Sequence, residues 1–264
     1  MNIHYKKIAV SYDDVGKGEP IVLLHGFLEN KKMWAFFVDS FQSKFRVITI
    51  DLLGHGQTSA LGYVHTMQEN AEMVAMVLTA LQIKKCIIIG HSMGGYVALE
   101  LAKNKSHEVQ KLVLLNSTSL PDSAEKKANR DRAIVAVKKD YQTFVRLSIA
   151  NLFSVENRER LATEIENTKI EALKTPLQGI VASLEGMKIR SDNNDFFRNL
   201  EIPKLLILGE KDAVLPCQET AIQTENSDIQ LKKLSFGHMS HMENKEELLL
   251  IFEFFFDVIK GITK

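Results

Sequence analysis

The chain has 264 residues, 45% of them hydrophobic and 25% charged, which is enough for one sizeable core and a smaller second unit. Its 33 Lys and Arg residues balance its 33 Asp and Glu residues, so the charge gives no reason to expect a nucleic acid or an anionic membrane as partner. Two cysteines cannot make a disulfide framework, and the N-terminus lacks the apolar core of a signal peptide, so a cytoplasmic protein is expected.

The first half of the chain alternates between short apolar runs and helical patterns. Residues 3–12 alternate loosely in polarity and predict one or two edge strands, followed by a turn at 15–20. Further strands are expected at 21–24, 45–50, 86–89 and 109–115, and helices at 31–41, 66–81 and 96–102. Because these strands are continuously apolar and alternate with helices, they predict a mostly parallel central sheet flanked by helices, an α/β fold.

The alternation stops at about residue 118 and resumes near residue 203. The intervening sequence holds helical patterns without a convincing buried strand, at 123–138, 141–153, 156–172, 176–187 and 195–200. Strands then follow at 203–209 and 229–234, with helices at 217–226 and 245–259. We predict an α/β core of residues 1–117 and 201–264, with a helical cap of residues 118–200 inserted at the carboxyl edge of the sheet, where open α/β folds place their ligands.

The last helix contains the longest apolar stretch, residues 248–259. Glu253 and Asp257 interrupt this stretch, and it is too short to span a bilayer. It therefore predicts a packing helix, and no membrane partner is expected.

A G-H-S-M-G sequence at residues 90–94 is the clearest functional motif. It matches G-x-S-x-G and lies between a predicted strand and a predicted helix, which is the context that this motif requires. A turn this tight is expected to strain the backbone of Ser92, while Gly90 and Gly94 leave room for strand and helix to approach. The serine hydroxyl would then stand at a helix N-terminus, where developing negative charge is favoured. Ser92 is the candidate nucleophile.

A serine nucleophile needs a base to accept its proton and a group to orient that base. His238 lies just after the last predicted strand, and His241, three residues further on, is its main competitor. We favour His238 as the base because it lies in the loop between that strand and the final helix. His25, His55 and His91 flank glycines in other loops, and we expect them to orient the backbone instead.

The orienting acid and the oxyanion donors are expected at other strand ends. Asp212 follows the strand 203–209 directly and is preferred over Glu210, since the order serine, aspartate, histidine is the one found in this architecture. The backbone N–H groups of Phe27 and Met93 are the expected donors to the tetrahedral oxygen.

Together these motifs resemble the α/β-hydrolase superfamily, in its capped single-domain serine hydrolase branch. The similar segments are H-G-F at 25–27, D-L-L-G-H-G at 51–56, G-H-S-M-G-G at 90–95, G-E-K-D at 209–212 and G-H at 237–238, with Glu243 five residues beyond the histidine. The resemblance implies an α/β-hydrolase fold with Ser92 as nucleophile, Asp212 as acid and His238 as base. It also implies that Asp51 and Glu243 have structural roles.

The expected function is hydrolysis of a small ester, thioester or lactone through an acyl-enzyme, as in carboxylesterases. Two alternatives remain open: a carbon–carbon bond hydrolase or lyase with the same triad, of the menaquinone-synthesis or ring-cleavage-product type, and a slow-turnover ligand receptor on the same fold. Lyases of menaquinone synthesis often carry arginine where this chain has Tyr96.

The sequence predicts a small-molecule substrate and a monomer or homodimer. It holds no HExxH motif and no phosphate-binding loop, so neither a metal nor a cofactor is expected. The substrate-binding residues are not identified by any motif. Residues 122–146 hold seven Lys or Arg residues against four Asp or Glu residues. An anionic substrate could use this surplus, although such a run is more often a solvated helix face.

Overall fold

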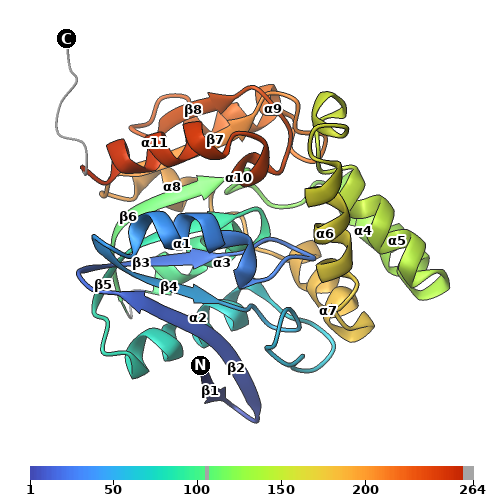
Figure 1. Ribbon diagram of the computed structural model, residues 1–264, viewed down its shortest axis with the longest axis horizontal. Coiled ribbons are helices and arrows are strands. Elements are labelled where there is room, and N and C mark those ends of the chain that lie inside the picture. Colours follow the sequence, from blue (N-terminus) through green and yellow to red (C-terminus); the bar gives the residue numbers. More distant parts are fainter. Residues whose placement is uncertain (105–106, 258–264) are drawn as a thin grey trace.

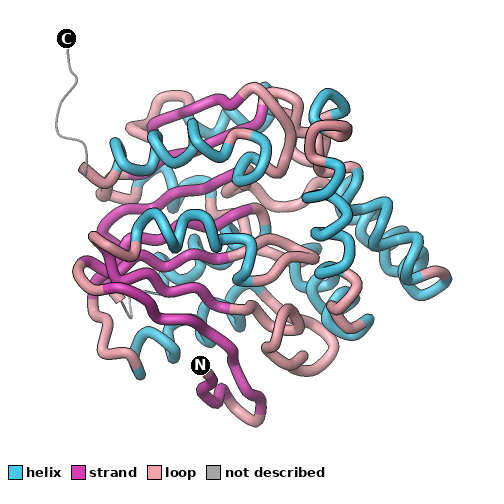
Figure 2. The backbone as a smooth tube through the Cα atoms, viewed as in Figure 1, coloured by secondary structure: helices cyan, strands magenta, loops and turns pink. Residues whose placement is uncertain are grey.

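The computed structural model describes residues 1–104 and 107–257. In this part of the chain the strands form one eight-stranded sheet with helices on both sides (Figures 1 and 2). The strands are β1 (Asn2–Tyr5), β2 (Ile8–Gly16), β3 (Glu19–Leu24), β4 (Phe45–Ile50), β5 (Lys85–His91), β6 (Glu108–Leu115), β7 (Lys204–Gly209) and β8 (Gln230–Leu234). Their order across the sheet is β1-β2-β4-β3-β5-β6-β7-β8.

The sheet is antiparallel at one edge and parallel elsewhere. Strand β2 pairs antiparallel with β1 and β4, as its loosely alternating sequence suggests for an edge. From β4 to β8 every neighbouring pair is parallel. The carboxyl ends of these strands therefore meet at one edge, which brings the loops after β3, β5, β7 and β8 together. The predicted α/β fold class is confirmed.

Side-chain alternation along the strands divides the interior into two cores. In β3, Ile21 and Leu23 pack with Trp34 and the aromatic residues of the helices on one face. Val22 and Leu24 belong to the core on the other face. A strand turns successive side chains to opposite faces, so a continuously apolar strand needs helices on both sides.

Helices α1 (Ala35–Phe41) and α11 (Lys245–Phe255) cover one face, while α2 (Met67–Ala80) and α3 (Met93–Asn104) cover the other. The remaining helical segments outside the 118–200 region are η1 (Lys31–Trp34), α9 (Cys217–Ala221), η3 (Ile222–Thr224) and α10 (Ser240–Glu243). The predicted last helix, 245–259, is α11, which ends at Phe255 and is followed by a turn at 256–257, so its predicted end was too late; residues 258 and 259 lie outside the described part of the chain. No helix in the described ranges combines the length and hydropathy that crossing a membrane requires.

The chain between β6 and β7 is helical wherever it is regular. It forms α4 (Ala124–Lys139), α5 (Tyr141–Ala150), η2 (Val155–Asn157), α6 (Ala162–Ala172), α7 (Leu177–Lys188) and α8 (Asn194–Asn199). Helices α4 to α7 gather on the side toward which β3 and β6 point (Figure 1). We call residues 118–200 the helical insertion; its separate status as a domain stays a prediction.

Several predicted helix boundaries were wrong: the helix predicted at 141–153 ends at Ala150, and the one predicted at 217–226 is α9 followed by η3. The helix after the serine begins at Met93 and not at Tyr96, because Gly94 and Gly95 are poor helix formers that hide its first turn in the sequence. The predicted helix 156–172 starts only at Ala162. The side chain of Asn157 donates to Glu243 at 3.0 Å, so the tertiary contact takes precedence over helical pattern there.

Candidate active site

The turn after β5 holds Ser92 in a strained conformation. Its φ angle is 49°, in the left-handed region that non-glycine residues rarely adopt. A Cβ on Gly90 would come within 2.4 Å of the Gly94 carbonyl oxygen, and one on Gly94 within 2.4 Å of the Leu24 carbonyl oxygen. Both glycines are therefore required by the close approach of α3 to the sheet, and the strain predicted at Ser92 is confirmed.

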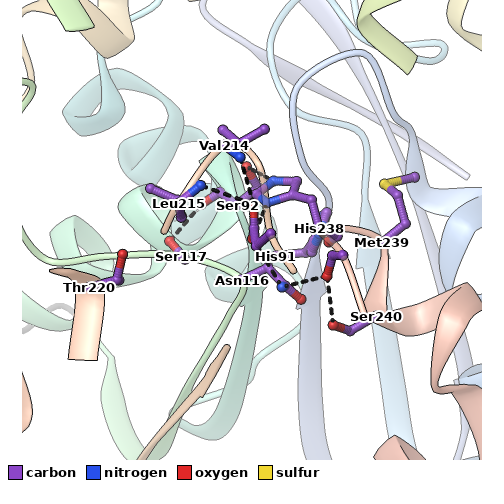
Figure 3. A network of polar contacts seen from close by, with 12 residues as sticks. His91, Ser92, Asn116, Ser117, Val214, Leu215, Thr220, His238, Met239 and Ser240 are labelled. Atoms are coloured by element: carbon purple, nitrogen blue, oxygen red, sulfur yellow. Dashed lines mark hydrogen bonds and ion pairs between the residues drawn. The ribbon is translucent and has the colours of Figure 1, made fainter. Parts of the chain in front are cut away.

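Three of the predicted site residues meet at the carboxyl edge of the sheet. His238 Nε2 lies 2.9 Å from Ser92 Oγ, and His238 Nδ1 lies 2.7 Å from Asp212 Oδ2. Figure 3 shows the Ser92 and His238 side chains pointing toward each other. Since Asp212 accepts at Nδ1, the imidazole presents an unprotonated Nε2 to the serine hydroxyl. A proton acceptor, His238 Nε2, therefore lies next to the serine hydroxyl, and the Asp212 carboxylate binds the opposite ring nitrogen.

Asp212 is buried and fully engaged by hydrogen bonds. Its Oδ1 accepts from the N–H groups of Val214 and Leu215 at 2.8 and 2.9 Å, and its Oδ2 accepts from Asn116 Nδ2 at 3.2 Å. Burial opposes ionisation, but the neighbouring His238 and the two backbone donors outweigh it, so the pKa of Asp212 lies below its ordinary value. Glu210, the alternative acid, is exposed.

His241, the competing base, lies away from the serine hydroxyl. Its ring nitrogens make no hydrogen bond within the described residues, and its Nε2 lies 3.5 Å from Glu29 Oε1. Burial lowers the pKa of His241 to about 3, so the ring is neutral near pH 7. The structure therefore places His238, and not His241, within hydrogen-bond distance of the Ser92 hydroxyl.

A buried pair formed by Glu29 and His91 supports the loops around the serine. Glu29 Oε2 lies 2.7 Å from His91 Nδ1 and accepts from the Gly26 N–H at 2.8 Å. His91 Nε2 donates to the His238 carbonyl oxygen at 2.9 Å. Because a carbonyl oxygen only accepts, both ring nitrogens of His91 carry a proton when Glu29 is ionised. The pair joins the loop after β3, the turn at Ser92 and the loop that carries His238.

The charges of this pair stabilise each other in the interior. Burial alone would raise the pKa of Glu29, but the adjacent His91 lowers it to about 2. Burial would lower the pKa of His91, but Glu29 raises it. Glu29, His91 and His241 also bring metal-ligand atoms within 4.8 Å of one another. Both ring nitrogens of His91 are already engaged, Nδ1 by Glu29 at 2.7 Å and Nε2 by the His238 carbonyl oxygen at 2.9 Å, so we assign the cluster a positioning role.

The two predicted oxyanion donors, Phe27 and Met93, are close to Ser92 in different ways, and their role stays a prediction. Phe27 lines the same cavity as Ser92, and Met93 follows Ser92 as the first residue of α3. His25 accepts from the Leu52 N–H at 2.9 Å through Nε2 and contacts the Gly26 carbonyl oxygen at 2.7 Å through Nδ1. His25 thus orients backbone, as its glycine neighbour suggested.

Glu243 and Asp51 hold loops, as the resemblance implied. Glu243 accepts from the N–H groups of Gly237 and Ser154 at 3.0 and 2.9 Å, which ties the His238 loop to the helical insertion. Asp51 accepts from the N–H groups of Lys31 and Gln57 at 2.8 and 3.0 Å. Asp51 thus holds backbone, and Glu243 holds backbone together with the Asn157 side chain.

A small cavity of about 90 Å³ opens over the serine. The helical insertion contributes Arg130, Ser148, Leu152 and Met187 to its wall. The core contributes Phe27, Leu28, Glu29, His91, Ser92, Tyr96, Val214 and His238. Its wall is mainly apolar, with polar groups at the serine and at Arg130, which suits a small ligand held by few polar contacts.

Sequence patterns did not identify Glu29, Asn116 or Arg130 as site residues. Glu29 and His91 are 62 positions apart, and no local motif links them. A carboxylate two residues after H-G-F was a weak signal, because loop acids are usually solvated. Asn116 followed a predicted strand, and Arg130 was one of the seven Lys or Arg residues in the 122–146 region.

Replacing Glu29 with Gln is expected to destabilise the fold by about 3 kcal/mol, because it leaves His91 buried without its anionic partner. Denaturant unfolding followed by fluorescence measures this loss. Glu166→Gln is the matched control, since Glu166 is exposed and solvent screens its ion pairs with Lys169 and Arg146, so its loss should have a much smaller effect on stability. Equal effects of both changes would contradict the assigned role.

The same pair predicts that the free energy of unfolding of the wild-type protein decreases at both low and high pH. The pKa of Glu29 falls from 4.5 to about 2 on folding, so its contribution is complete above pH 4.5 and is lost as the pH falls toward 2. The pKa of His91 rises from 6.5 on folding, so its contribution is complete below 6.5 and is lost as the pH rises through the folded value.

Comparison with known proteins gives a consistent set of relatives. A family profile described as alpha/beta hydrolase fold matches residues 19–245. The chain is 30% identical over 249 residues to a putative 2-succinyl-6-hydroxy-2,4-cyclohexadiene-1-carboxylate synthase of Bacillus subtilis, with 90% of each chain covered. A malate-bound thermophilic esterase from Thermogutta terrifontis is 29% identical, with a TM-score of 0.87 over 96% of this chain and 95% of that one.

One similar protein is considerably longer. The chain is 27% identical over 235 residues to the dihydrolipoyllysine-residue acetyltransferase component of the acetoin cleaving system of Pseudomonas putida. That match covers 88% of this chain and 61% of the relative.

Proposed function

Because the chain belongs to the alpha/beta hydrolase fold family, we propose that it is a serine hydrolase that cleaves a small ester, thioester or lactone. The family resemblance read from the motifs is confirmed. A fold alone does not define a reaction, so the proposal rests on the site. The observation that carries it is the chain of contacts from Ser92 Oγ through His238 to Asp212, at 2.9 and 2.7 Å.

In the proposed reaction Ser92 attacks the substrate carbonyl while His238 Nε2 takes the hydroxyl proton. The imidazolium that forms is stabilised by Asp212, which is already ionised and held by two backbone donors. The backbone N–H groups of Phe27 and Met93 would receive the tetrahedral oxygen. His238 then gives its proton to the leaving group, and a water activated by the same base releases the acyl-enzyme.

The cavity supports a small acyl group. Its volume of about 90 Å³ and its mainly apolar wall suit an acyl chain of only a few carbons beside the reacting carbonyl. We propose that the helical insertion acts as a cap, which is supported by the presence of Arg130, Ser148, Leu152 and Met187 among the residues that line the cavity at Ser92. The cysteines Cys86 and Cys217 are free and buried, which is compatible with a reducing, cytoplasmic location. A monomer or homodimer remains the proposed state.

Hydrolysis of p-nitrophenyl esters of increasing acyl length tests this function. We expect turnover of the short esters and a decline of kcat/KM as the acyl chain outgrows the cavity. A folded wild-type protein with hardly any activity toward the whole series would contradict the esterase proposal.

The Bacillus subtilis relative, named as a cyclohexadiene-carboxylate synthase, favours a second candidate in the lyase class. The same serine and histidine would then serve for proton abstraction and not for acyl transfer. Such a protein would show weak esterase activity and form little acyl-enzyme. A mass increase of the protein after mixing with a p-nitrophenyl ester, equal to the acyl group, favours the hydrolase.

A further inference from the structure

Arg130 of α4 stands at the junction of two cavities. The cavity of about 90 Å³ over Ser92 and a neighbouring cavity of about 540 Å³ share three lining residues, Tyr96, Arg130 and Val214. A ligand whose carbonyl reaches Ser92 can therefore extend past the Arg130 side chain. Among the residues described as lining the inner cavity, Arg130 is the only lysine or arginine.

Arg130 belongs to a cluster with one more positive charge than negative. The side chain of Asp122 is fully buried, and it accepts hydrogen bonds from the guanidinium groups of both Arg130 and Arg190. Burial alone would raise the pKa of Asp122, but the two arginines lower it, so the carboxylate is ionised. Two guanidinium groups thus share one carboxylate close to the serine.

The guanidinium group of Arg190 is engaged by protein acceptors, whereas some N–H groups of Arg130 have no strong acceptor. Arg190 donates to the Leu120 and Met187 carbonyl oxygens and stacks on Tyr96, with its Cζ 4.2 Å from the ring centroid. Arg130 uses Nε and Nη2 for Asp122, and its Nη1 meets only the Met187 sulfur at 3.4 Å, a weak acceptor. At least two of the five N–H groups of Arg130 therefore remain for a ligand.

Other charges around the cavities do not cancel this surplus. Glu29 is paired with His91. Asp212 keeps its negative charge beside the neutral His238, but it lines neither cavity. Glu125 and Glu219 line the outer cavity, but they are exposed and Lys126 lies among them, so solvent screens their effect. A partly enclosed cation without a full complement of acceptors favours an anion of matching geometry.

We propose that Arg130 binds a carboxylate of the substrate, so that the natural substrates are short esters or thioesters with a free carboxylate a few carbons from the scissile carbonyl. This inference rests on the proposed hydrolase function and narrows its substrate class. The apolar wall of the inner cavity would hold the carbons between the two groups. Arg190 would serve as a positioning residue, because it holds Asp122 and Tyr96 beside Arg130.

The test compares two esters that differ by one charged group. Monoethyl glutarate and ethyl pentanoate have acyl chains of equal length, ending in a carboxylate and in a methyl group. Ethanol release gives kcat/KM for both esters, and their ratio measures the preference for the anion. We expect the wild-type protein to prefer monoethyl glutarate and Arg130→Gln to lower that ratio at least tenfold, mainly through KM, because a charge-assisted hydrogen bond is lost.

Two further variants separate binding from folding. Arg132→Gln is the same substitution on the same helix at an exposed position, and it should leave the ratio unchanged. Arg130→Lys keeps the charge without the planar fork and should recover part of the preference. An unchanged ratio in Arg130→Gln would overturn the inference, and so would an equal loss of activity on both esters.

Binding measurements keep this inference separate from the proposed function. If the esters are hydrolysed but Arg130→Gln leaves the ratio of the two kcat/KM values unchanged, the hydrolase proposal is supported and the carboxylate site is contradicted. If neither ester is hydrolysed, isothermal titration calorimetry with monoethyl glutarate tests the carboxylate site directly by measuring the Kd. Binding to the wild-type protein that weakens at least tenfold in Arg130→Gln supports the site, and an absence of binding to the wild-type protein overturns it.

Discussion

Replacing Ser92 with Ala is expected to lower kcat toward short p-nitrophenyl esters on the order of 10⁶-fold, as removal of a triad serine does elsewhere. The hydroxyl is the only group that the change removes. Alanine accepts the φ of 49° with strain similar to that of serine, so the fold should be retained. Any remaining hydrolysis would come from water attack assisted by the oxyanion donors.

Ser148→Ala is the matched control for this experiment. Ser148 lies on α5 and lines the same cavity, but its hydroxyl makes no hydrogen bond with His238 in the described structure. Its loss should change kcat by less than tenfold. Retained activity in a folded Ser92→Ala protein, checked by circular dichroism and thermal unfolding, would remove Ser92 from its proposed role.

Replacing Asp212 with Asn is expected to cost on the order of 10⁴-fold in kcat. The amide can turn its NH₂ toward His238 Nδ1, so the ring proton moves to Nε2 and the nitrogen that faces Ser92 at 2.9 Å loses its lone pair. The imidazolium would also lose its anionic partner. Acyl-enzyme formation, followed in a stopped-flow burst, should fall with kcat.

Glu210→Gln separates the two acids considered from the sequence. Glu210 is exposed, so Glu210→Gln should change kcat by less than twofold. A loss of kcat below tenfold in Asp212→Asn would indicate that another residue is the acid. Stability offers an independent check. The pKa of Asp212 is lowered from 3.8 on folding, so its contribution is present above 3.8 and is lost as the pH falls through the folded value. The Asn variant should lack this part of the acid transition.

Local sequence predicted most of the fold because its signals act over short distances. The apolar runs that became β3, β4, β5, β6 and β7 needed helices on both faces, and alternation in Ile21 and Val22 assigns them to opposite cores. Gly90 and Gly94 predicted the tight turn at Ser92, since no side chain fits there. The order of Ser92, Asp212 and His238 in the chain then followed the order of the strands.

The choice between His238 and His241 was decided by three-dimensional packing. Both histidines follow the same strand, three residues apart, and both are buried. The loop bonded to Glu243 directs His238 to Ser92, whereas the first turn of α10 places His241 beside Glu29. A spacing pattern cannot distinguish these outcomes, because the loop conformation depends on contacts with Ser154 in the insertion.

The sequence by itself therefore determined the sheet, the turn at Ser92 and the candidates for nucleophile, base and acid, because each has a local pattern. Only the tertiary structure decided that Glu29 and His91 connect the loops around Ser92, and that Asp122 accepts hydrogen bonds from both Arg130 and Arg190. Glu29 is 62 residues from His91, and Asp122 is 68 residues from Arg190. Buried polar groups must find partners wherever the fold brings them, and those partners fix the chemistry around the serine.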